Sequence, residues 1–139
     1  MQIIKTSLRW AARAVLGASC LGILAFSAIA DSAFPFGQDL LLDARPMKGS
    51  KRVPIIEIDD GGAAVIELWC NSMQGQAVIA GDTITIVPGP RTERACPPER
   101  VKADDDIIEA LQQVTGWRRT GSGVALTGPR TLNFRLPTN

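Results

Sequence analysis

Apolar and polar residues alternate after residue 53 in a way that predicts short strands joined by tight turns. Residues 54–60 (PIIEIDD) and 63–70 (AAVIELWC) lie on either side of a Gly-Gly pair, which is typical of a hairpin. In the second run Ile66, Leu68 and Cys70 share one face, because successive side chains of a strand point to opposite sides. We therefore expect Cys70 to point towards the core.

A second hairpin has a clearer turn. Residues 76–80 (QAVIA) and 83–87 (TITIV) are separated by Gly-Asp, and glycine in the first place of a two-residue loop suits a type II′ turn. This turn predicts three cross-strand pairs: Ala80–Thr83, Ile79–Ile84 and Ala77–Ile86. One face of the hairpin is then apolar and the other largely polar, as expected of a sheet that covers a core.

One helix interrupts the strands. Residues 104–114 (DDDIIEALQQV) place four apolar side chains on one helical face: Ile107, Ile108, Leu111 and Val114. Asp104–Asp106 would cap the first amide groups, although Pro97-Pro98 would also make a good first turn and start the helix earlier. Gly116 is a natural end for it.

The chain beyond this helix returns to strands. Residues 117–120, 124–127 and 131–137 are separated by glycine-containing turns, and Leu132, Phe134 and Leu136 alternate with polar residues in the last run. The pattern as a whole predicts a mainly β fold of the α+β type, with a single helix.

The first thirty residues follow a different pattern. Three basic residues, Lys5, Arg9 and Arg13, precede an apolar run over residues 14–30 that ends in Ala-Ile-Ala. This arrangement is typical of a cleaved signal peptide. We expect residues 1–30 to be removed after Ala30 and the protein to be exported to the periplasm. Residues 31–139 would then form one domain, with its core at about 37–137.

Two alternatives would keep this segment. An uncleaved anchor needs roughly 20 apolar residues, and glycine and serine dilute the run here. A lipoprotein signal at Cys20 would need a branched apolar residue where Gly17 stands. Cleavage is the better interpretation, and no stable membrane span would then remain.

Composition excludes several kinds of chemistry. The 139 residues contain no histidine and no tyrosine, so neither Cys-His nor Ser-His catalysis nor a histidine metal site is possible. Removing three cations from fifteen leaves twelve against fourteen acidic residues, so the net charge falls from +1 to −2. This balance argues against a nucleic-acid partner. We expect no enzyme activity and no cofactor.

Several charged and aromatic positions have both a functional and a structural interpretation. The acidic runs 59–62 and 103–106 lack the ligand spacing of a calcium loop, so turn formation and helix capping explain them better. Six arginines could form an anion-binding patch, or could simply lie on solvated strand faces: Arg91, Arg94, Arg118, Arg119, Arg130 and Arg135. Trp69 and Trp117 could mark a binding surface or fill the end of a barrel. Asn71 is expected to bond its own turn backbone.

Cys70 and Cys96 could be a nucleophile, metal ligands or a disulfide. Cys70 lacks a general base, a basic neighbour and a helix N-terminus, and a metal needs more ligands than two thiols. The exported chain would retain only these two cysteines, in an oxidising compartment. Cys96 also precedes the helix that must cover the face to which Cys70 points. We predict an intramolecular disulfide between them.

Two elements resemble the META domain, a family that includes the HslJ-like heat-shock proteins of the bacterial envelope. Residues 69–76 (WCNSMQGQ) resemble its Gly-Cys-Asn-x-x-x-Gly-Tyr element through Cys70, Asn71 and Gly75. Residues 91–99 (RTERACPPE) resemble a second element. Its three matching positions are Thr92, Ala95 and Cys96. The helix and the last hairpin follow in the expected order.

The resemblance implies a small antiparallel barrel or half-barrel of lipocalin-like topology with one helix and no catalytic residues. Family members are associated with stress response, antibiotic tolerance, secretion or virulence. We therefore expect a non-enzymatic exported protein with a structural, envelope-stress or protein-interaction role, and an envelope protein as its partner. The alternative is a periplasmic carrier that holds a small apolar ligand in the barrel.

Overall fold

The computed structural model describes residues 33–138, which form eight strands and one helix. The strands are β1 (Leu40–Leu42), β2 (Ile55–Ile58), β3 (Ala63–Glu67), β4 (Ser72–Ala80), β5 (Thr83–Arg91), β6 (Gly116–Thr120), β7 (Gly123–Thr127) and β8 (Leu132–Arg135). The helix α1 (Pro98–Gln112) lies between β5 and β6. The predicted signal peptide lies outside the described residues. Within residues 33–138, α1 included, no helix has both the length and the hydropathy that crossing a membrane requires.

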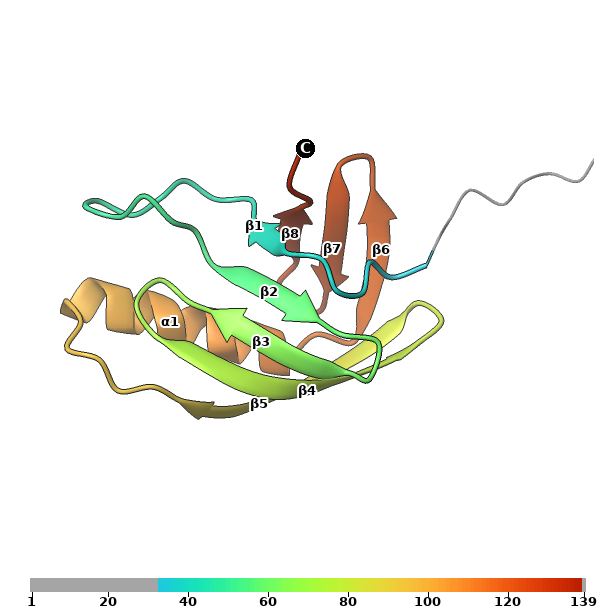
Figure 1. Cartoon of the computed structure of the whole chain (residues 1–139), viewed down its shortest axis with the longest axis horizontal. Helices are drawn as coiled ribbons and strands as arrows, with labels where there is room; N and C mark the ends of the chain where they lie inside the picture. The colour runs from blue at the N-terminus through green and yellow to red at the C-terminus, as the bar shows by residue number, and fades with distance from the viewer. Residues whose placement is uncertain (1–32, 139) are drawn as a thin grey trace, which may run out of the picture.

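The strands form one closed antiparallel barrel in which each pairs with its neighbours in sequence and β1 pairs with β8. The prediction of a mainly β barrel with one helix is confirmed, and closure decides between the barrel and the half-barrel. β1 itself was not predicted. The extent of pairing differs around the barrel. β4 and β5 pair along most of their length, whereas β5 and β6 share only the pair Thr83–Gly116. Figure 1 shows β6–β8 turning away from the long β2–β5 sheet at this point.

The predicted register of the β4–β5 hairpin is confirmed at all three pairs, Ala80–Thr83, Ile79–Ile84 and Ala77–Ile86. Ile84 and Ile86 are buried, while Thr85 between them is exposed. Gly81, at the first loop position, has a φ of 60°, which glycine adopts without steric cost. Local turn chemistry and alternation therefore fix this part of the sheet.

The hairpin of β2 and β3 also forms, but β3 ends at Glu67. Leu68 is buried and Trp69 and Cys70 are partly buried within a bend. The prediction that strand alternation carries on to Cys70 is therefore wrong. A backbone hydrogen bond closes the bend: the Leu68 N–H donates to the Asn71 carbonyl at 2.8 Å.

Helix α1 begins at Pro98, so the earlier of the two predicted starts is right and capping by Asp104–Asp106 is wrong. Proline suits the first turn because its missing N–H would have no partner there. The helix ends at Gln112, so the predicted end at Gly116 is also wrong. Gly116 starts β6 instead, where a Cβ would lie 2.8 Å from the Thr127 hydroxyl.

The barrel interior is filled by packed apolar side chains. The helix adds Ile107 and Leu111 to this core, as its periodicity predicted, and Ile108 packs against the edge of the core. Val114 is also buried in the core, but it lies just beyond the end of the helix. The strands supply most of the rest: Leu40, Leu42, Ile56, Ile58, Ala64, Ile66, Met73, Ala77, Ile84, Ile86, Trp117, Val124, Leu126, Leu132 and Phe134. At roughly 25 cal/mol per Å² of apolar surface, such burial is the main stabilising contribution to the fold.

Candidate functional site

A polar network ties the β3–β4 bend to the helix at one end of the molecule, and Asn71 is its centre. Asn71 is 6% exposed, and its side-chain carbonyl accepts hydrogen bonds from the Thr92 hydroxyl and the Arg94 N–H, both at 3.0 Å. Its amide donates to Asp104 at 3.1 Å. The expectation of a local turn bond is therefore wrong, because the partners of this side chain come from two distant segments.

Asp104 is the acceptor of the network and is completely buried. Its carboxylate receives the backbone N–H of Cys70 at 3.2 Å and that of Asn71 at 3.0 Å, besides the Asn71 amide. A buried carboxylate is costly unless hydrogen-bond donors surround it, and these three donors meet that need. Asp104 therefore holds the bend against α1 rather than capping the helix.

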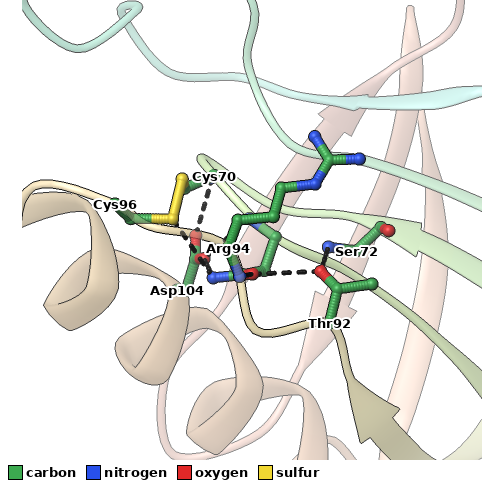
Figure 2. The surroundings of a disulfide bond; sticks show 7 residues. Cys70, Ser72, Thr92, Arg94, Cys96 and Asp104 are labelled. Carbon is green, nitrogen blue, oxygen red and sulfur yellow. Dashed lines mark hydrogen bonds between the residues drawn. A yellow bond between two sulfur atoms is a disulfide. The ribbon is translucent and has the colours of Figure 1, made fainter.

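The predicted cysteine pair lies beside this network (Figure 2). Cys70 and Cys96 stand at disulfide distance, with their Cα atoms 6.2 Å apart. The Asn71 amide also lies 3.5 Å from the Cys96 sulfur. The bridge and the network hold the same two segments together, so the end of the molecule that contains them is fixed in two ways.

The six residues of the family-like elements do not all meet. Cys70, Asn71, Thr92 and Cys96 take part in the network or the bridge. Ala95 is exposed and lines a neighbouring polar cleft. Gly75 lies farther along β4, where a Cβ would come within 2.8 Å of the Val87 carbonyl. It permits close approach of β5 at the irregularity between Met73 and Gly75, where the β4–β5 register shifts.

The other end of the molecule carries an aromatic cleft of about 650 Å³, called the end cleft below. Its lining residues are Ala33, Phe34, Phe36, Ile79, Gly81, Asp82, Trp117, Arg118 and Arg119. The Phe34 ring meets Phe36 and Trp117, each at a centroid distance of 5.1 Å. Phe36 is 40% exposed, and it is the one aromatic residue among the exposed large apolar side chains of residues 33–138.

The end cleft lies next to the contact between β5 and β6, where the two strands share only one residue pair. Trp117 donates its backbone N–H to the Asp82 carbonyl and its indole N–H to that of Gly81, both at 2.8 Å. Beyond Trp117, β6 pairs with β7 only, so Arg118–Thr120 have no strand on their outer side among the described residues. The cleft therefore combines aromatic walls, two arginines and an open strand edge.

Trp117 and Trp69, the two tryptophans considered as possible binding residues, differ in their burial. Trp117 is buried at the barrel end, and Trp69 is partly buried at the other. Sequence reasoning missed Phe34 and Phe36, which precede the first strand and show no periodicity. Their closeness in the chain to one another was the only available signal. Among residues 33–138, no three acidic or cysteine side chains are grouped to hold a metal ion.

The family comparison agrees with this architecture. The META domain model matches residues 39–136, which include every strand and the helix. No curated protein and no solved structure matches the chain significantly. The match covers far more than half of the sequence and contains both elements that resemble the family. The chain belongs to the META domain family.

Proposed function

We propose that this META-domain protein is exported to the periplasm and acts without catalysis, by binding an extended segment of an envelope protein in the end cleft. The single observation that carries the proposal is the cleft itself. It joins exposed Phe36 to the edge of β6 at Arg118–Thr120, which no strand within residues 33–138 pairs on its outer side. Export rests on the signal-peptide pattern of residues 1–30.

The residues that line the end cleft indicate which peptide sequence it would bind. An extended peptide can add to a free strand edge through its main chain, while alternate side chains enter neighbouring pockets. The rings of Phe34, Phe36 and Trp117 favour apolar side chains. Arg118 and Arg119 outnumber Asp82, so an acidic residue next to the apolar one would be attracted. We therefore expect a peptide in which apolar and acidic residues alternate.

A small apolar ligand is the second candidate, and the volume of the end cleft favours it. A cleft of about 650 Å³ lies in the range of ordinary ligand sites. The barrel interior is filled with side chains, so such a ligand would lie in the end cleft rather than inside the barrel. The two candidates thus share one location and differ in their occupant.

The test uses the mature protein, purified from the periplasm and labelled with ¹⁵N. Titration with a synthetic peptide of alternating apolar and acidic residues should shift the amide signals of Phe36 and Arg119. A scrambled peptide of equal composition should shift them far less. Phe36→Ala should weaken binding about tenfold, since a contacting aromatic ring is a common hot spot. Val78→Ala is the matched control, because Val78 is exposed and outside the cleft.

The outcomes separate the candidates. Native mass spectrometry that finds a stoichiometric apolar molecule on the purified protein, with no peptide binding, would favour the carrier. Equal effects of Phe36→Ala and Val78→Ala would contradict both. N-terminal sequencing tests export separately: a mature protein that begins at Asp31 supports it, while one that retains Met1 contradicts it.

A further inference from the structure

A second cleft, called the basic cleft below, lies beside the disulfide and has a volume of about 490 Å³. It is lined by the loop at 49–53, the bend at 67–72, the segment 94–95 and Arg100 at the start of α1. The loop, the bend and the stretch from residue 94 to Arg100 come from three separate parts of the sequence and meet only in the folded protein. Its lining residues include Cys70 and none of those that line the end cleft, so the two clefts are separate.

The basic cleft has a marked excess of positive charge. Four of its lining residues are cations, Lys51, Arg52, Arg94 and Arg100, whereas Glu67 is the only acidic one. Arg52 and Glu67 are 3.8 Å apart, with side chains 84% and 51% exposed, and such a pair contributes little. This excess contrasts with the near balance of charge over the whole chain.

Two of these cations have side chains that pair with no other residue in the described part of the chain. Among residues 33–138, neither the Lys51 ammonium nor the Arg94 guanidinium makes a hydrogen bond or an ion pair with another side chain. Figure 2 shows the Arg94 side chain extending away from Asp104, so it does not neutralise that buried carboxylate. Their charges are available to a ligand.

The framework of the basic cleft is fixed before any ligand arrives. The Arg94 backbone N–H is held by buried Asn71, and Cys96 two residues later is bridged to Cys70. The Arg100 guanidinium, which also lines the cleft, donates to the Lys48 carbonyl at 3.2 Å and so links the loop to the helix. A preorganised framework lowers the entropy lost on binding.

We propose that the basic cleft binds a phosphoryl group. Guanidinium groups match phosphate oxygens through paired N–H donors, and several cations around one small site suit a dianion better than a single carboxylate. Partly buried Trp69 supplies a flat apolar wall for whatever carries the phosphate. The carrier is either a soluble phosphate ester or the headgroup of an anionic lipid, which share this chemistry.

The test compares probes of both sources on the mature, oxidised protein. ¹⁵N NMR titration with glucose 6-phosphate should shift the signals of Arg94 and Trp69 in the wild type. The double variant Lys51→Gln/Arg94→Gln should bind at least about tenfold more weakly. Both side chains are surface-exposed and unpaired, so this variant should remain folded, as far-UV circular dichroism would show. Arg118→Gln/Arg119→Gln, in the end cleft, is the matched control and should bind normally.

The lipid arm uses co-sedimentation with vesicles of phosphatidylglycerol or of phosphatidylcholine. Binding to glucose 6-phosphate identifies a soluble ester, and binding only to phosphatidylglycerol vesicles identifies a lipid headgroup. Either result supports the proposal if the Lys51/Arg94 double variant loses it. No binding of any phosphate probe by the wild type, or equal loss in both double variants, overturns it. Neither result bears on the peptide site at the other end.

Discussion

The two ends of this barrel are held together by different means. At the disulfide end, a covalent bridge and the carboxylate of Asp104 fix the β3–β4 bend against α1. At the end cleft, β5 and β6 share a single strand pair, supported by two hydrogen bonds from Trp117 and by the packing of Phe34 against Trp117. The first end gains rigidity from directional bonds. The second leaves Arg118–Thr120 without a strand on their outer side among the described residues, and the proposed peptide site uses this edge.

The largest effect is expected when the buried acceptor of the polar network at the disulfide end is removed. Asp104→Ala leaves three N–H donors buried without an acceptor and should lower the free energy of unfolding by about 4–5 kcal/mol. Urea denaturation measures this change. Asp105→Ala is the control: this neighbouring side chain is exposed and pairs only with Arg91, so the loss should be under about 1 kcal/mol. Similar losses for both would mean that the network is not what stabilises this end.

The disulfide is the next largest contribution. It encloses the whole β4–β5 hairpin, and for a loop of this size the chain-entropy model gives about 3–4 kcal/mol. Cys70→Ser/Cys96→Ser should therefore unfold at correspondingly lower urea. Thiol counting on the unfolded, unreduced mature protein should find no free thiol. Two free thiols in protein from the periplasm would contradict the pairing and reopen the question of a reactive Cys70.

The β4–β5 hairpin joins the two ends, and its register can be tested by a pair of neighbouring residues. Ile86 is 3% exposed and Thr85 lies on the outer face, so Ile86→Ala should cost about 3 kcal/mol and Thr85→Ala under about 1 kcal/mol. Thermal or urea unfolding of the two variants gives the comparison. Equal costs would mean that the hairpin is displaced by one residue.

The smallest effect on stability is expected at the end cleft. Phe36 is 40% exposed and outside the packed core, so Phe36→Ala should change the free energy of unfolding by under about 1 kcal/mol. Its binding defect, described above, would then be a loss of contact rather than of fold. A large loss of stability would instead show that Phe36 is a structural residue and that side chains at both ends contribute strongly to the free energy of unfolding.

Features that depend on residues close together in the sequence could be predicted, whereas those that depend on distant residues could not. The β4–β5 register was accessible because a two-residue turn and strict alternation are local signals. The start of α1 was ambiguous because Asp104 reads locally as a cap. Its actual partners, Cys70 and Asn71, are more than thirty residues away. No local pattern distinguishes an aspartate that caps a helix from one that supports a distant bend.

The binding surfaces were harder to anticipate for a similar reason. The end cleft needs Phe34 and Phe36 to lie beside Trp117, a contact between the first described residues and a strand near the end of the chain. The basic cleft needs Lys51 and Arg94 to converge, while in the sequence each is one of many scattered cations. The cysteine pair was the exception, because only two cysteines remain after residue 30.

The bridge also bears on how the protein withstands proteolysis. Its two cysteines flank the hairpin, whose tip at Gly81 and Asp82 is exposed and is a natural place for a protease to cut. After such a cut, the two fragments would stay covalently linked through Cys70 and Cys96, and each would keep its strand in the barrel. A nicked molecule would therefore migrate as one species on a non-reducing gel and separate into two only after reduction.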